Sequence, residues 1–100
     1  MNVIMDLTVS PLGAGVSVSK YIAACHELIE EAGLSSNLHA YGTNIEGEWD
    51  TVFAVVKKCH EKLHAMGVPR ITSSIKAGTR IDKSQTIKDK IDSVAAKLDV

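Results

Sequence analysis

The chain begins with an alternation of apolar and polar residues and continues with apolar residues at helical spacing. Every second residue from Val3 to Val9 is apolar, which predicts a strand with one apolar face. Apolar residues then recur roughly every three or four positions in 18–32, 52–66 and 87–98, which predicts amphipathic helices. Gly33 and Gly67 follow the first two of these segments, as is typical of residues that end a helix.

The strands and turns between the helices complete the predicted order. In chain order we expect a strand at 2–9, a helix at 18–32, strands at 37–41 and 45–47, a helix from 50, a strand at 70–77 and a helix from 84. Residues 42–44 are expected to form a turn, and Ser17 and Ser19 are candidate caps of the first helix. This β-α-β-β-α-β order predicts an α+β, ferredoxin-like fold: a four-stranded antiparallel sheet with two helices on one face and an extra C-terminal helix.

Length and composition restrict the range of functions. A chain of 100 residues suits one small domain, so we expect a single domain over residues 1–100. The net charge of -1, the scattered basic residues and the 4% aromatic content argue against a nucleic-acid partner. No apolar stretch has the length of a membrane span. Because the start of the chain lacks the features of a secretion signal, its two cysteines are expected to be reduced thiols of a cytoplasmic protein, packed as small hydrophobes.

One motif raises the possibility of metal chemistry. His60-Glu61-Lys62-Leu63-His64 spells H-E-x-x-H, in which two imidazoles one helical turn apart bind zinc and the glutamate acts as general base. The helical spacing, however, puts both histidines on the flank of the apolar face. A catalytic zinc would also need a third protein ligand. We therefore expect no metal site and structural histidines, and the alternative is a zinc hydrolase that uses His60, Glu61 and His64.

A second constellation lies between the middle strands and the helix that follows them. The segment from Tyr41 to Trp49 holds two aromatic side chains, a hydroxyl and carboxylates between glycines. A flat heterocycle could stack there while Glu46 or Thr43 hydrogen-bonds its edge. A hairpin with a solvated, acidic helix start explains the same residues equally well. Similarly, the turn 11–15 fits either an anion site at a helix start or a plain capped turn.

The sheet face that the two helices leave open is predicted to be semi-polar. If the apolar residues of the first strand face the helices, then Ile4, Asp6 and Thr8 face away from them. The other residues expected on this face are His39, Tyr41, Thr72 and Ser74. Such a surface suits packing against a second subunit with room for a polar ligand, and simple solvation is the alternative.

Several short motifs, taken in order, resemble one protein family. They are Pro11-Leu12-Gly13, Ser17-Val18-Ser19-Lys20-Tyr21, Gly42-Thr43-Asn44-Ile45-Glu46-Gly47, Gly67-Val68-Pro69-Arg70 and Arg80-Ile81-Asp82-Lys83. Together they resemble the thiamine-binding protein family, formerly catalogued as a family of unknown function. It shares a superfamily with the YkoF-type proteins that bind thiamine and hydroxymethylpyrimidine. The resemblance covers essentially the whole chain.

The resemblance implies a small-molecule binding protein and not an enzyme. It implies a ferredoxin-like protomer that pairs through its sheet into a homodimer or homotetramer, with thiamine or its hydroxymethylpyrimidine moiety bound at the oligomer interface and no cofactor. The residues carried over are Thr43 and Glu46, together with their neighbours Tyr41 and Asn44. Asp6 on the open face adds a carboxylate of a suitable type. A structural or regulatory homo-oligomer without a small ligand is the alternative.

The chemistry of thiamine fits these residue types, and one segment departs from the family pattern. A carboxylate and a hydroxyl can satisfy the amino group and ring nitrogens of the aminopyrimidine, while aromatic and acidic groups attract the thiazolium cation. Many relatives carry acidic residues between the last strand and the Arg-x-Asp motif, where this chain has Ala77-Gly78-Thr79. Any ligand or ion contact that those acids make in relatives is therefore not expected here.

Overall fold

The computed structural model describes residues 1–98 and has the predicted order of elements. The elements are β1 (Asn2–Leu12), α1 (Ser19–Glu31), β2 (Ser35–His39), β3 (Gly42–Glu48), α2 (Trp49–Ala65), β4 (Arg70–Gly78) and α3 (Ile87–Leu98). The sheet has the strand order β2-β3-β1-β4, and every neighbouring pair is antiparallel. The predicted ferredoxin-like arrangement with an extra C-terminal helix is thus confirmed.

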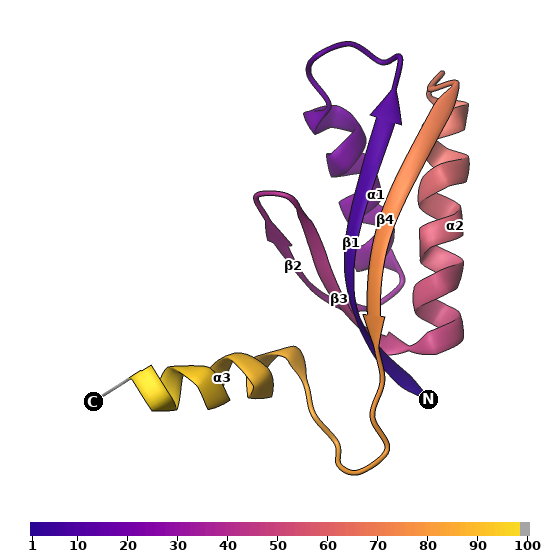
Figure 1. Cartoon of the computed structure of the whole chain (residues 1–100). Helices are drawn as coiled ribbons and strands as arrows, with labels where there is room; N and C mark the ends of the chain where they lie inside the picture. The colour runs from indigo at the N-terminus through magenta and orange to yellow at the C-terminus, as the bar shows by residue number, and fades with distance from the viewer. Residues whose placement is uncertain (99–100) are drawn as a thin grey trace.

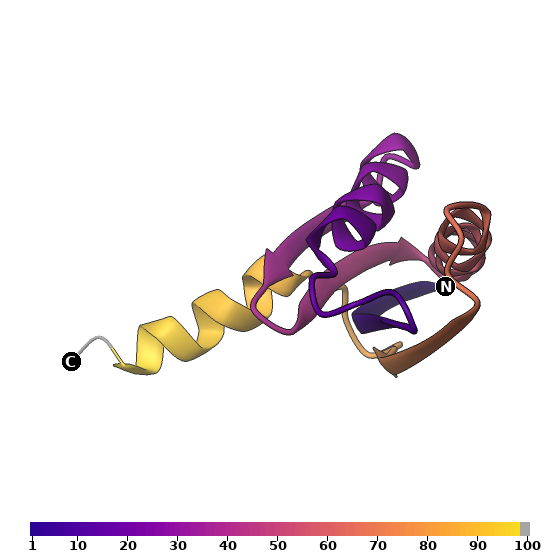
Figure 2. The same cartoon turned by 90° about the horizontal axis from the view of Figure 1, so that it is seen from above.

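The helices are distributed unequally around the sheet. Figure 1 shows α1 and α2 behind the strands, on one face of the sheet. In both Figure 1 and Figure 2, α3 extends away from this body. The other face of the sheet is therefore left open. The loop after β4 runs below the lower ends of the strands in Figure 1 before it reaches α3. Within residues 1–98, no helix combines the length and the apolar character that a membrane crossing requires.

The core lies between the sheet and the two helices behind it. Along β1, every second side chain is buried while its neighbours stay partly exposed, because successive side chains of a strand point to opposite faces. The buried core residues are Val3, Met5, Leu7, Val9, Tyr21, Cys25, Ile29, Ile45, Val52, Val55, Val56, Cys59, Leu63 and Val68. Full burial of a large apolar side chain stabilises the fold by roughly 1.5–3 kcal/mol. The predicted core positions of Cys25 and Cys59 are confirmed.

The hairpin between β2 and β3 differs from the prediction. β2 covers Ser35–His39 in place of 37–41, and β3 begins at Gly42, so the expected turn at 42–44 was wrong. Thr43 pairs with residues of two neighbouring strands and is therefore interior to the ladder. The turn consists of residues 40–41, and the hydroxyl of Thr8 donates a hydrogen bond to the carbonyl oxygen of Tyr41 at 2.8 Å. Gly and Asn in 42–47 have low strand propensity, so the sequence pattern did not predict that the strand begins at Gly42.

The helix ends confirm one expectation and correct another. Gly33 and Gly67 have φ angles of 73° and 95°, so each adopts the left-handed conformation that ends a helix. At the start of α1, the expected serine caps were wrong: the capping position is Val18, and no side chain caps the helix there. The first turn of α1 is closed by main-chain bonds alone, in which the Tyr21 and Ile22 N–H groups donate to the Val18 carbonyl oxygen.

The final helix starts at Ile87 and not at 84, because a reciprocal cap closes it there. The hydroxyl of Thr86 accepts a hydrogen bond from the Asp89 N–H at 3.1 Å, and the Asp89 carboxylate accepts one from the Thr86 N–H at 3.0 Å. Such a capping box satisfies main-chain donors that a helix start leaves without intrahelical partners. Residues 79–86 therefore form the connection between β4 and α3.

Candidate functional site

A pocket lies where the open face of the sheet meets the connection 79–86. Its volume is about 920 Å³, within the range of about 300–1,000 Å³ that is common for small-molecule sites. β1 and β3 contribute the side chains of its floor, while β4, the connection and the start of α3 form its wall. The pocket is therefore built by segments from both ends of the chain.

The register of the sheet brings polar side chains together on the pocket floor. Ile4 of β1 lies opposite Glu46 of β3, and Asp6 lies opposite Asn44. Residues that face each other across an antiparallel pair project from the same side of the sheet. Three of the predicted ligand residues, Asp6, Asn44 and Glu46, consequently line one pocket.

Asp6 is held by a histidine from the hairpin. His39 Nε2 lies 2.7 Å from Asp6 Oδ1, and both side chains are partly exposed. His39 Nδ1 accepts a hydrogen bond from the Tyr41 N–H at 3.3 Å. Because Nδ1 is the acceptor, the proton of the neutral ring lies on Nε2, which donates to Asp6. The hairpin thus orients one carboxylate of the floor.

Glu46 links the pocket floor to the last helix. Its Oε2 accepts a hydrogen bond from the Ile87 N–H at 2.8 Å, and the side chain of Ile87 is 6% exposed. A carboxylate at a helix start also interacts favourably with the positive end of the helix dipole. An ionised carboxylate has acceptor capacity beyond one bond, so Glu46 can hold α3 and still accept from a ligand. No local motif signals this link, which spans 41 residues of sequence.

The wall of the pocket is basic, a feature that no motif of the sequence predicts. The cationic residues that line it are Lys76, Arg80, Lys83 and Lys90. Arg80 binds both carboxylate oxygens of Asp82 at 2.6 Å and donates to Gln85 Oε1 at 2.8 Å. This guanidinium lowers the pKa of Asp82 to about 2. The basic residues are scattered in the sequence, and only the path of 79–86 brings them to one place.

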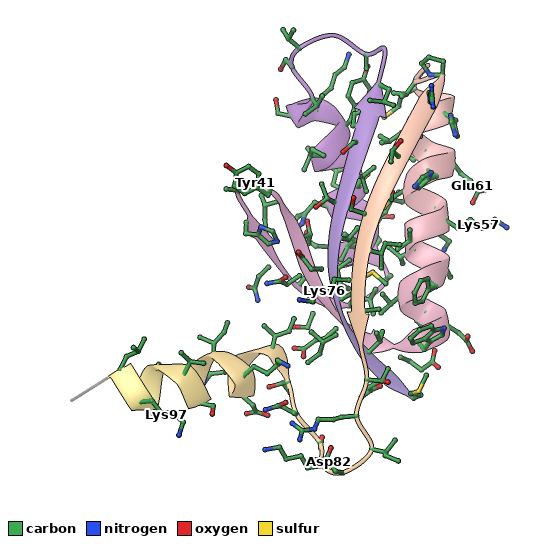
Figure 3. The ribbon with its side chains drawn as sticks, in the orientation of Figure 1. Tyr41, Lys57, Glu61, Lys76, Asp82 and Lys97 are labelled. Carbon is green, nitrogen blue, oxygen red and sulfur yellow. The ribbon has the colours of Figure 1, made fainter. Side chains whose placement is uncertain are left out.

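Two of the predicted ligand residues lie elsewhere. Thr43 is 7% exposed and faces α1 and α2, on the opposite side of the sheet from Glu46. Tyr41 is 85% exposed at the tip of the hairpin, where its side chain points outward (Figure 3). The structure therefore does not bring these two side chains to the pocket of their own protomer.

The H-E-x-x-H segment lies on α2, away from the pocket. His60 Nε2 lies 2.6 Å from the hydroxyl of Ser73, and His64 Nδ1 donates to the Val68 carbonyl oxygen at 2.8 Å. Glu61 projects outward from α2 (Figure 3). Among residues 1–98, no group of three or more His, Cys, Asp and Glu side chains is placed to hold a metal ion. Both histidines thus tie α2 to the segments that follow it.

Comparison with known proteins identifies one family and several relatives that align with almost the whole chain. The family profile described as "Thiamine-binding protein" matches residues 5–95. UPF0045 protein sll0230 of Synechocystis sp. is 61% identical over 99 residues, which are 99% of this chain and 82% of the relative. UPF0045 protein ECM15 of Eremothecium gossypii is 40% identical, over 98% of this chain and 94% of the relative.

Solved structures show the same fold. The crystal structure of MJ1052 from Methanocaldococcus jannaschii matches with a TM-score of 0.87 at 33% identity, over 94% of this chain and 96% of that chain. TM0486 from Thermotoga maritima matches with a TM-score of 0.80 over 94% of this chain and 99% of that chain, and at 19% identity it shows the fold alone. The profile match spans nearly the whole sequence, and the relatives are similar over almost their full length. The chain therefore belongs to the thiamine-binding protein family.

Proposed function

We propose that this protein binds thiamine or its hydroxymethylpyrimidine moiety in the pocket on the open sheet face and catalyses no reaction. The observation that carries the proposal is the convergence of Asp6, Asn44 and Glu46 on one pocket in a member of this family. TM0486, which shares the fold, is itself described as a protein proposed to act in thiamine biosynthesis or salvage. We further propose that the protein acts in the cytoplasm as one binding domain.

The floor of the pocket suits an aminopyrimidine. The exocyclic amino group can donate to the carboxylate of Glu46 or Asp6, and the amide of Asn44 can donate to a ring nitrogen. Hydrogen bonds to an ionised acceptor are stronger than those between neutral groups. The flat ring would lie over the floor, and Ile4 supplies an apolar contact between the polar side chains. Thr43 has no route to a ligand in this arrangement.

The first prediction concerns direct binding. Calorimetric titration of the folded protein is expected to show saturable binding of thiamine and of hydroxymethylpyrimidine, because both carry the aminopyrimidine ring. The thiazole alcohol that forms the other half of thiamine serves as the control ligand and is expected to bind far more weakly. Absence of binding at millimolar thiamine and hydroxymethylpyrimidine, or equal binding of the thiazole alcohol, would contradict the proposed function.

We also propose that the protein works as a homodimer or homotetramer, with the ligand near a subunit interface. The apolar face of α3 carries Ile91, Val94 and Leu98, which are 58%, 59% and 75% exposed. An apolar stripe of this kind on a projecting helix is normally covered by another surface. Tyr41 is also exposed and could contact a second copy of the chain. In the oligomer, this predicted ligand residue could then lie at the binding site of a neighbouring subunit.

The second prediction tests self-association. The double substitution Ile91→Lys with Val94→Lys places two charges on the apolar stripe and is expected to convert the oligomer to smaller species in sedimentation equilibrium. The matched control, Ser93→Lys with Ala96→Lys, adds the same charge to the other side of α3 and is expected to leave the mass unchanged. A wild-type chain that sediments as a lone monomer would refute the proposal. An intact oligomer that binds no ligand would favour the structural or regulatory alternative.

A further inference from the structure

The charges around the pocket are unequal. The cationic side chains that line it are Lys76, Arg80, Lys83 and Lys90, whereas the carboxylates that line it are Asp6 and Glu46. Residues 77–79, which lie between two of these cations and also line the pocket, carry no charge. The side chains that line the pocket therefore include more positive charges than negative ones.

Most of the other charged groups are already engaged. Arg80 is neutralised by Asp82, Asp6 accepts from His39, and Glu46 accepts from the Ile87 N–H. The remaining cations of the wall are lysines. In the part of the chain that the structure describes, no ion pair within 4.0 Å includes Lys76, Lys83 or Lys90.

The acidic neighbours of the wall do not remove this excess. Lys83 lies within electrostatic reach of Asp82 and Asp89. Asp82, however, is bound by Arg80, and Asp89 accepts the Thr86 N–H in the helix cap. Both carboxylates thus have closer partners than the lysine. The lysine ammonium groups stay available to a ligand.

Three elements bring these lysines to the same pocket. Lys76 lies in β4 opposite Asp6, over the open face of the sheet (Figure 3), while Lys83 belongs to the connection and Lys90 to the first turn of α3. The hydroxyl residues Thr79, Ser84 and Thr86 line the pocket beside them. Ammonium and hydroxyl groups are donors without a competing negative charge, and together they suit the oxygens of a phosphate.

We infer that the ligand of this pocket is a phosphate ester of the heterocycle, with the ring over the floor and the phosphate against Lys83 and Lys90. Unphosphorylated thiamine is a cation, which a wall of lysines repels. A phosphate or diphosphate group reverses the sign of that interaction. The inference rests on the proposed function, and it narrows the ligand class to phosphorylated pyrimidines or thiamine phosphates.

The experiment compares ligands with and without phosphate on matched variants. Calorimetric titration of the full chain uses hydroxymethylpyrimidine, its phosphate, thiamine, thiamine monophosphate and thiamine diphosphate, with inorganic pyrophosphate as the anion alone. We expect the phosphate esters to bind at least about tenfold more tightly than the parent compounds. The substitution Lys83→Gln with Lys90→Gln is expected to abolish this advantage, so that each ester and its parent compound bind with affinities within about twofold of each other.

The control variant removes the same charge at a distance. Lys57→Gln with Lys97→Gln changes lysines on the outer side of α2 and near the far end of α3 (Figure 3) and is expected to retain the preference for esters. Thermal unfolding verifies that both double variants fold. If both variants lose the preference equally, the effect is one of net charge and the inference is overturned.

The remaining outcomes separate the inference from the proposed function. Equal affinities for the esters and their parent compounds, insensitive to Lys83 and Lys90, would overturn the inference and leave the proposed function standing. Comparison of the pyrimidine phosphate with the thiamine phosphates tells which ester is bound. Binding of pyrophosphate that depends on the two lysines, without binding of any pyrimidine, would support the anion site and overturn the proposed function.

Discussion

Replacing Glu46 with alanine is expected to weaken thiamine binding about tenfold to a hundredfold and to loosen α3. Glu46 also accepts from the main chain of α3, through the Ile87 N–H at 2.8 Å. A hydrogen bond to a charged group contributes about 1.5–3 kcal/mol, and each factor of ten in affinity corresponds to about 1.4 kcal/mol. Titration calorimetry measures the affinity, and the rate of limited proteolysis within 79–98 measures the attachment of α3.

Two further variants separate the roles of this side chain. Glu46→Gln keeps an oxygen that can accept from the Ile87 N–H, so α3 is expected to resist proteolysis as in the wild type while ligand affinity falls. Glu61→Ala removes a carboxylate from the outer face of α2 and is expected to change neither measurement. If the Glu46→Ala protein bound thiamine with unchanged affinity, the carboxylate of Glu46 would not be a ligand-binding group.

The sheet and its helical cover could be predicted because their pattern is local. Alternate burial along β1 and apolar residues at helical spacing in α1 and α2 require no knowledge of distant contacts. Gly33 and Gly67 marked helix ends because few other residues adopt a positive φ without strain. Where one apolar face has to be buried, the order of elements leaves little freedom in the topology.

The hairpin was harder to predict, and the error affected the site. Because 42–44 was expected to be a turn, the alternation of faces along β3 could not be applied to it. In the continuous strand Gly42–Glu48, Thr43 and Glu46 lie at positions of opposite parity, so their side chains point to opposite faces. The family resemblance had carried both residues over from one motif, which says nothing of the face to which each side chain points.

The wall of the pocket depends on contacts that no local pattern records. The bond between Glu46 and Ile87 joins β3 to a helix that begins after two further elements of the chain. The Arg80–Asp82 pair and the Thr86 cap hold residues 79–86 in their path. This path determines which lysines line the pocket. Such a path follows from tertiary contacts, so the basic residues looked scattered in the sequence.

Replacing Gly42 with alanine is expected to destabilise the protein by about 1–3 kcal/mol, the usual cost of overpacking. A Cβ at this position would clash with the carbonyl oxygen of Leu7 and lie 2.9 Å from the Thr8 hydroxyl. That hydroxyl donates to the Tyr41 carbonyl oxygen at 2.8 Å, so relief of the clash would disturb the turn or the pairing of β1 with β3. Gly42 is thus required by close backbone approach and not by a left-handed φ. Thermal unfolding measures the loss, and each kcal/mol lowers Tm by about 4–8 °C in a domain of this size.

Gly78 provides the matched control for this substitution. It ends β4, it has no positive φ, and a Cβ there would meet nothing within 4 Å. Gly78→Ala is expected to leave Tm unchanged or to raise it, because alanine reduces the conformational entropy of the unfolded chain by the equivalent of about 0.4–1 kcal/mol. If Gly42→Ala melted at the temperature of the wild type, β3 would not approach Leu7 this closely. The register that gathers Asp6, Asn44 and Glu46 on one face would then need revision.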